Sequence, residues 1–123
     1  MIIIDVQRDF TLSGGSAEIP GTIQDIPYIQ DLTQGCKKLG YPVINAVRLC
    51  GRLQQIGSME WIMYKSRWGA FYSTLLEEHL CSLAINTVII AGCNFPNCPR
   101  STIHQASERD FRIILAKDAT SQT

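Results

Sequence analysis

The cysteine at position 98 is the residue of this sequence best placed for covalent chemistry. It follows an apolar run and a tight turn, and it precedes a helical pattern. Backbone N–H groups at a helix start favour an anion, so we expect the thiol pKa to fall. A thiolate there is a nucleophile, and the Cys98 amide with an earlier loop amide could hold an oxyanion, since Pro99 has no N–H. Position alone fits a small buried core cysteine equally well.

Two charged residues are the natural partners of that sulfur. Asp5 ends the apolar run 2–4, where it could take up a proton or could instead cap a turn. Lys65 lies in the segment 64–71, which is expected to be a loop before a helix. It could stabilise a thiolate or an oxyanion, although most loop lysines are only solvated.

Other candidate sites are weaker. His79 and His104 are on different predicted helices and have no third ligand at metal spacing, so no metal site is expected. Cys93 and Cys98 have neither zinc nor C-x-x-C spacing, but a regulatory disulfide between them stays open. Gly14 and its glycine neighbour follow no phosphate-loop pattern and form a turn.

The elements that must position these residues alternate between strand and helix. Apolar runs predict strands at 1–4, 42–47, 87–91 and 112–116. Periodic patterns predict helices at 26–39, 74–83 and 98–109. The segment 48–65 is irregular and receives no assignment. Buried strands between helices indicate a parallel sheet covered on both faces, with ligands at the carboxyl edge of the strands.

Helix ends carry local signals of their own. Asp25 is the expected N-cap of the first long helix, with Pro27 in its first turn and Gly40 just past its end. The inner face of that helix is expected to include Ile29, Cys36 and Leu39. Thr74 and Glu77 have the spacing of a capping box for the next helix.

Length and charge limit the classes of protein that fit. The 123 residues suit a single domain, 46% of them are hydrophobic, and the net charge is zero. A neutral chain has no broad attraction to nucleic acid or to a membrane, so we expect a small-molecule substrate or a second copy as partner. The start lacks a secretory pattern and the five cysteines are scattered, which favours a reducing cytoplasm.

Three motifs, in this order, resemble the isochorismatase-like cysteine hydrolases. They are the sequence at 5–10, Lys65 with Phe71 and Thr74, and the run 92–98 that leads into Thr102. The resemblance covers nearly the whole chain. It implies a three-layer α/β/α, Rossmann-like fold with a mostly parallel sheet, no cofactor, and a homo-oligomer (dimer or tetramer). The implied activity is hydrolysis of a C–N bond (amide, ureide or carbamoyl) through a thioester on a cysteine.

The resemblance also implies a role for each matching residue. Cys98 matches the nucleophile, Asp5 the general base and Lys65 the third catalytic member. A cis peptide is implied between Cys93 and Asn94, which would place the Asn94 amide beside that of Cys98 in an oxyanion site. Expected substrate contacts are Phe10, Trp68, Asn94 and Phe95.

Some features depart from the family pattern. A proline, Pro99, follows the nucleophile, and no histidine precedes Glu78, which disfavours a metal-dependent nicotinamidase. The single domain 1–123 is short for the family: either it is a natural minimal form, or a loop near 49–56 and a strand and helix after 123 are missing from the sequence. Three alternatives stay open: vinyl-ether hydrolysis of the isochorismatase type, a catalytically silent binding or assembly protein, and a redox protein using Cys93 and Cys98.

Overall fold

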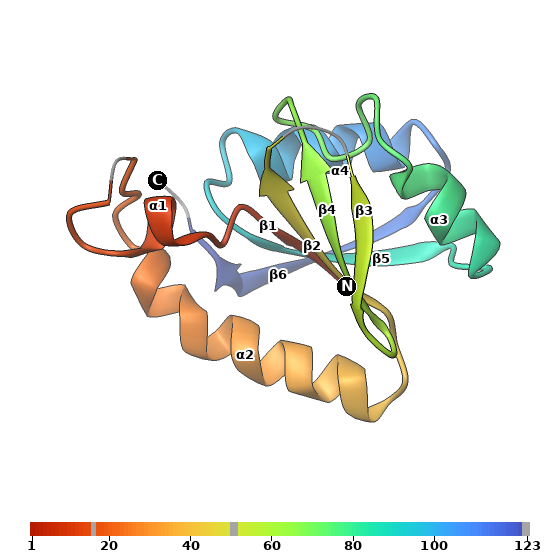
Figure 1. The fold of residues 1–123 in the computed structure, drawn as a ribbon, viewed down its shortest axis with the longest axis horizontal. Helices are drawn as coiled ribbons and strands as arrows, with labels where there is room; N and C mark the ends of the chain where they lie inside the picture. Colours follow the sequence, from red (N-terminus) through yellow and green to blue (C-terminus); the bar gives the residue numbers. More distant parts are fainter. Residues whose placement is uncertain (16, 50–51, 122–123) are drawn as a thin grey trace.

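A six-stranded sheet forms the centre of the computed structural model, which describes residues 1–15, 17–49 and 52–121 (Figure 1). The strands are β1 (Ile2–Ile4), β2 (Val43–Arg48), β3 (Leu53–Gly57), β4 (Glu60–Lys65), β5 (Thr87–Gly92) and β6 (Arg112–Thr120). The helices are α1 (Arg8–Thr11), α2 (Thr22–Lys38), α3 (Leu76–Ser82) and α4 (Cys98–Ser107). The order of the strands in the sheet is β3-β4-β2-β1-β5-β6.

The strand order reverses at β1. This strand pairs in parallel with β2 on one side and β5 on the other, with Ile4 opposite both Ala46 and Gly92. From β2 the sheet continues to β4, and from β5 it continues to β6, again in parallel. Only the edge strand β3 is antiparallel among the described strands. The predicted α/β class with a mostly parallel sheet is confirmed, and its crevice lies where β1 and β5 end.

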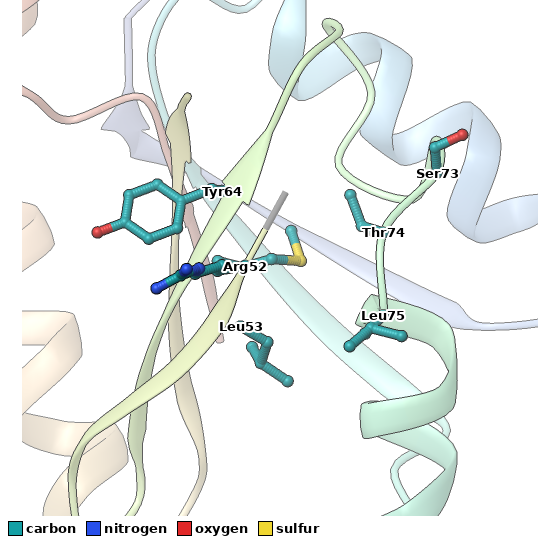
Figure 2. Close-up of a pocket in the computed structure, with 7 residues that line it drawn as sticks. Arg52, Leu53, Tyr64, Ser73, Thr74 and Leu75 are labelled. Atoms are coloured by element: carbon teal, nitrogen blue, oxygen red, sulfur yellow. The ribbon is translucent and has the colours of Figure 1, made fainter. Parts of the chain in front are cut away.

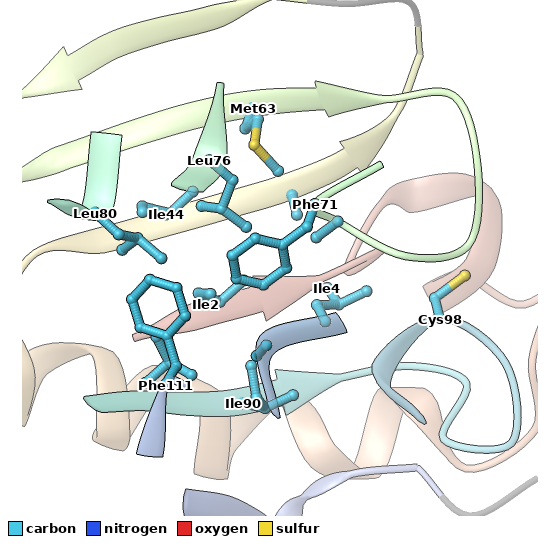
Figure 3. Close-up of a cluster of buried hydrophobic side chains, with 14 of the residues drawn as sticks. Ile2, Ile4, Ile44, Met63, Phe71, Leu76, Leu80, Ile90, Cys98 and Phe111 are labelled. Carbon is cyan, nitrogen blue, oxygen red and sulfur yellow. The ribbon is translucent and has the colours of Figure 1, made fainter. Parts of the chain in front are cut away.

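Helices cover both faces of the sheet and bury unequal cores. In Figure 1, α2 lies under one face, while α3 and α4 lie over the other. The larger core lies on the α3/α4 side, and Figure 3 shows Cys98 at one end of it, beyond Ile4. The smaller core includes Ile3 of β1 and Ile29 of α2. The nucleophile candidate therefore lies at the margin of a packed apolar layer.

The first long helix begins earlier than the sequence predicts. It starts at Thr22 after Gly21, whose φ of 88° is readily adopted by glycine, so Asp25 lies inside the first turn and is not the cap. Pro27 consequently falls in the second turn. The other end is as predicted: Gly40 has φ 71°, and the chain closes a Schellman motif through Tyr41 N–H to Cys36 O at 2.9 Å. Leu39 is exposed, contrary to the predicted inner face.

The segment without a sequence assignment forms a β-hairpin. From Leu53 the chain forms β3, turns at residues 58–59, and returns as β4 beside β2. The expected missing loop at 49–56 falls partly here, and its residues 50–51 lie outside the described residues. Every second residue of β4 is buried, and the sequence prediction did not recognise this alternating pattern as a strand. Because β4 was missed, Lys65 was expected in a loop, whereas it is the last residue of that strand.

Two smaller differences concern the ends of elements. The Thr74 side chain accepts a hydrogen bond from Leu76 N–H at 3.3 Å but is not the N-cap of α3, a position held by Leu75. Glu77 pairs with Arg109 instead of completing a capping box. Strand β6 continues to Thr120, beyond the predicted end at residue 116.

Gly92 allows β5 to end in direct contact with β1. Its φ is 117°, and a Cβ at this position would lie 2.1 Å from the Ile4 carbonyl oxygen. That oxygen also accepts a hydrogen bond from Cys93 N–H at 2.9 Å. A side chain at position 92 would therefore push the turn that follows β5 away from the end of β1.

No helix within the described residues is long and apolar enough to cross a membrane.

Candidate active site

The backbone of Asp5 is fixed where β1 ends. Its φ is 55°, in the left-handed region that aspartate tolerates better than most residues. The Asp5 amide donates to Ala46 O at 2.8 Å, and its carbonyl accepts from Gln7 N–H at 2.9 Å. The Cys93 thiol donates to the same carbonyl, with a sulfur–oxygen distance of 3.0 Å. These contacts turn a buried carboxylate, only 3% exposed, out of the strand direction and toward the crevice.

Lys65 reaches the same point from β4. Its side chain is fully buried, and Nζ donates to Asp5 Oδ2 at 2.9 Å and to the Arg67 carbonyl at 3.2 Å. A buried ammonium is costly unless it is paired and hydrogen-bonded, and this one is both. The predicted loop at Lys65 is therefore wrong, and so is the alternative interpretation of a lysine that is only solvated. The strand places the ammonium across the end of β2 and against the carboxylate.

Cys98 completes the cluster as the first residue of α4, with 5% of its surface exposed. The pKa of its thiol is raised to about 11: burial contributes most, hydrogen bonding to Asp5 and the negative charge of Asp5 also raise it, and Lys65 lowers it. The expected fall in pKa is wrong, because burial and the carboxylate outweigh the ammonium and the helix start. The thiol is thus protonated at neutral pH and needs a base in order to attack. Asp5 Oδ1 receives no well-aligned hydrogen bond from the described residues, so it can accept that proton.

Backbone amides border the sulfur. The peptide between Cys93 and Asn94 is cis, at the position that the family resemblance implies. Among the described residues, neither the Asn94 amide nor the Cys98 amide donates a backbone hydrogen bond. Cys98 heads α4, where first-turn amides lack an intrahelical acceptor. These two amides thus have no backbone acceptor within the described ranges, and their role in an oxyanion site stays a prediction.

Cys93 is close to this cluster but is poorly suited to redox chemistry. Its thiol is fully buried, burial raises its pKa to about 12, and its proton is engaged by the Asp5 carbonyl. Thiol–disulfide exchange proceeds through a thiolate, which this environment disfavours. Cys93 and Cys98 are both free thiols here, and a disulfide between them stays an untested prediction.

The four expected substrate contacts occupy different places. Phe10 lies in α1 and is half-buried, whereas Trp68 is 51% exposed in the segment after Lys65. Asn94 and Phe95 are half-buried in the turn after β5, and the Asn94 side-chain oxygen has no hydrogen-bond partner among the described residues. Their contacts with a substrate stay predictions.

A cavity of about 200 Å³ lies between the β3–β4 hairpin and the segment before α3 (Figure 2). Its lining residues are Arg52, Leu53, Met63, Tyr64, Ser73, Thr74 and Leu75. Since Asp5, Lys65 and Cys98 are not part of this lining, the cavity is separate from the cluster.

Sequence reasoning missed one residue that braces the site. Thr102 is fully buried in α4, where its hydroxyl donates to the Cys98 carbonyl at 2.8 Å and accepts from Ala70 N–H at 3.1 Å. The available signal was its spacing, because a residue four positions after a helix-initial nucleophile lies on the same helix face.

The family model described as "Isochorismatase domain" matches residues 1–123. The chain belongs to the isochorismatase family. The uncharacterized isochorismatase family protein YecD of Escherichia coli O157:H7 is 39% identical over 57 residues, covering 46% of this chain and 30% of that protein. N-carbamoylsarcosine amidase of an Arthrobacter species is 36% identical over 59 residues, covering 48% of this chain and 22% of that protein. The match thus spans about a third or less of the length of these curated relatives.

Solved structures of the isochorismatase family share the whole fold. An isochorismatase family protein from Desulfovibrio vulgaris superposes with a TM-score of 0.90 at 25% identity, covering 99% of this chain and 81% of that chain. The resemblance stated from three motifs is thereby confirmed at the level of family and fold. No group of three or more His, Cys, Asp or Glu side chains with metal-binding geometry occurs in the described parts of this family member.

Proposed function

We propose that this chain hydrolyses a C–N bond of a small amide, ureide or carbamoyl compound through a thioester on Cys98. The observation that carries the proposal is the convergence of a buried Asp5–Lys65 ion pair, at 2.9 Å, on a buried thiol whose pKa responds to both charges. Acid, amine and sulfur come from β1, β4 and α4, three distant stretches of chain. A thiol of perturbed pKa beside an ion pair, near the carboxyl ends of parallel strands, is typical of catalytic sites.

The first half of the reaction forms the thioester. Asp5 takes the proton of the Cys98 thiol as the sulfur attacks the substrate carbonyl carbon. The oxyanion that forms is held by the amides of Asn94 and Cys98. Asp5 then returns the proton to the leaving nitrogen, the C–N bond breaks, and an amine or ammonia departs.

The second half releases the acid. Asp5 takes a proton from a water molecule, and the resulting hydroxide attacks the thioester carbonyl. The carbon–sulfur bond breaks, the carboxylic or carbamic acid leaves, and the sulfur recovers its proton from Asp5. Lys65 stays paired with the Asp5 side chain and supplies positive charge beside the sulfur whenever the sulfur is anionic.

The choice of substrate class follows the chemistry of the site and its relatives. N-carbamoylsarcosine amidase, by its name, acts on a carbamoyl compound, so a carbamoyl or ureido group is our first choice. The unpartnered Asn94 side-chain oxygen could accept an N–H of such a group, and Phe10, Trp68 and Phe95 could form the walls. We also expect the protein to be a cytoplasmic homo-oligomer without cofactor, as the sequence predicts.

A trapping experiment tests the proposal directly. The protein is incubated with a panel of amides, ureides, carbamoyl compounds and vinyl ethers, quenched with acid, and digested for mass spectrometry, while product release is measured in parallel. We expect the mass of an acyl or carbamoyl group on the Cys98 peptide and catalytic release of amine. Cys98→Ala should abolish both, whereas Cys81→Ala, which changes an exposed free thiol, should retain both.

The same experiment separates the alternatives. Turnover retained by Cys98→Ala would contradict covalent catalysis. Hydrolysis confined to vinyl ethers, without an adduct, would favour the isochorismatase type of reaction. Binding of panel compounds by a folded protein, with neither adduct nor turnover, would identify a catalytically silent member of the family.

A further inference from the structure

The segment 66–71, between β4 and α3, touches both Lys65 and the helix that carries Cys98. At its start, the Arg67 carbonyl accepts the second hydrogen bond of the Lys65 ammonium, at 3.2 Å. At its end, the amides of Ala70 and Phe71 donate to the side chains of Thr102 and Gln105 on α4, at 3.1 and 3.0 Å. The segment therefore connects the strand that carries the amine to the helix that carries the sulfur.

Thr102 connects this segment to the nucleophile through a single oxygen atom. Its hydroxyl accepts from Ala70 N–H and donates to the carbonyl of Cys98 itself, at 2.8 Å. Thr102 and Ala70 are both fully buried, so water cannot replace either hydrogen bond. Hydrogen bonds thus join the Cys98 carbonyl through Thr102 to Ala70, and the covalent backbone of residues 67–70 continues from there to the Arg67 carbonyl, which binds the Lys65 ammonium.

Close packing reinforces the same contact. A Cβ at Gly69 would lie 2.2 Å from Gln105 Oε1, the atom that accepts from Phe71 N–H. A side chain at position 69 would therefore displace the Gln105 side-chain amide from its place against the segment. The Gln105 and Thr102 contacts are one helical turn apart and fix the segment at two points.

We infer that Thr102 is a positioning residue that sets the spacing between Lys65 and Cys98 by joining α4 to the segment 66–71. The inference rests on the proposed function for its kinetic consequences, but the geometry it describes also governs the reactivity of the thiol. Because Lys65 lowers the pKa of the Cys98 thiol, loosening this joint should weaken the ammonium's effect and slow the thiol's reactions. Thr102 itself need not touch the substrate.

The test compares Thr102→Val, which keeps the shape and loses both hydrogen bonds, with Thr102→Ser, which keeps the hydroxyl. Thr33→Val is the matched control, because Thr33 makes the same bond to a carbonyl four residues earlier, in α2, away from the site. We expect Thr102→Val to lower kcat by roughly tenfold with little change in KM, while Thr102→Ser and Thr33→Val stay close to the parent. Loss of kcat in Thr102→Val that Thr102→Ser does not restore would overturn the inference.

A second measurement needs no substrate and separates this inference from the proposed function. Iodoacetamide labelling of Cys98 at pH 8 is followed by peptide mass spectrometry, in the parent and in a Lys65→Met background. Thr102→Val should slow labelling by about threefold with Lys65 present and have little effect without it. An equal effect of Thr102→Val in both backgrounds, or no effect in the parent, would overturn the inference. The expected labelling pattern in a protein that hydrolyses none of the panel compounds would support the inference and count against the proposed function alone.

Gln105→Ala provides an independent variant should Thr102→Val fail to fold. It removes the acceptor of Phe71 N–H and leaves the bond between Thr102 and Cys98 in place. We expect a smaller decrease in labelling rate than for Thr102→Val, again only when Lys65 is present. Labelling at the parent rate by folded Gln105→Ala would contradict the role given to this joint.

Discussion

The two ends of the parallel strands are built from different kinds of residue. At the carboxyl end, Asp5 and Lys65 are buried as charges, and Cys98 is buried beside them. At the amino end, a cavity of about 360 Å³ is bordered by β1, β2, β5 and α3 and is lined mostly by apolar residues such as Ile44, Leu80 and Val88, with no charged side chain among its described lining residues. Burial of the charged groups at the carboxyl end does not stabilise the fold, whereas burial of the apolar side chains at the amino end does.

This difference separates function from stability along a single sheet. Buried charges cost free energy unless function requires them, whereas buried aliphatic side chains stabilise the fold directly. Substitutions at the carboxyl end should therefore change chemistry or leave a charge unpaired. Substitutions at the amino end should change only the fraction of folded molecules.

The largest expected effect is on catalysis, from Asp5→Asn. Loss of the general base should reduce kcat by about a thousandfold. Labelling of Cys98 by iodoacetamide at pH 8 should become faster, because Asp5 raises the pKa of that thiol and Lys65 lowers it. Asp31→Asn on the exposed side of α2 is the control. An inactive variant whose Cys98 reacts more slowly would contradict Asp5 as the group that holds the thiol protonated.

The next effect is on stability, from Lys65→Met. It leaves the Asp5 carboxylate buried without its ion-pair partner, which should lower the free energy of unfolding by about 3–5 kcal/mol in urea denaturation. The double variant with Asp5→Asn should recover much of that loss, since no unpaired charge is left. Lys38→Met, on an exposed position of α2, should have little effect. Additive losses in the double variant would show that the two side chains do not act as a pair.

At the amino end of the strands, Leu80→Ala should destabilise the fold without changing the reactivity of Cys98. Leu80 is 2% exposed in the larger core, and its truncation should cost about 3 kcal/mol. The rate constant for labelling of Cys98, measured below the onset of unfolding, should match the parent. A changed rate would show that the two ends of the sheet are coupled and would break the comparison.

The smallest effect concerns pH and arises from the two buried thiols. The pKa of Cys98 is raised from 9.0 to about 11 and that of Cys93 to about 12. Between pH 9 and these values the unfolded chain releases protons that the folded chain keeps, so stability falls as pH rises. We expect a loss of about 1–2 kcal/mol for each thiol by pH 10, and a shallower fall in Cys98→Ala. Equal slopes for parent and variant would contradict the raised pKa.

The sequence predicted the parts of the fold that depend on continuous apolar runs. β1, β2 and β5 are buried on both faces, so their composition alone marks them as strands. β4 was missed because its alternating pattern ends in a lysine, and a lysine suggests solvent. Its true position became evident only from its pairing with β2, a contact between segments that sequence patterns do not specify.

The motifs and their order predicted which residues come together in the site, but they did not predict the protonation state of Cys98. Asp5 and Cys98 follow strands whose ends meet, so their proximity could be inferred from the topology. The protonation state of Cys98 could not, because it depends on how deeply α4 begins in the core and on how close the carboxylate lies. The helix-start argument gave the wrong direction for the thiol pKa, since it considered one local influence and omitted burial.

Gly92 has a consequence for how this scaffold could change its substrate. The strand that leads to the acid and the strand that leads to the sulfur meet backbone to backbone at Ile4 and Gly92. Expected substrate contacts such as Trp68, which is 51% exposed, take no part in that contact. We therefore expect that laboratory evolution could change the expected substrate contacts to admit new molecules while the spacing between Asp5 and Cys98 is kept.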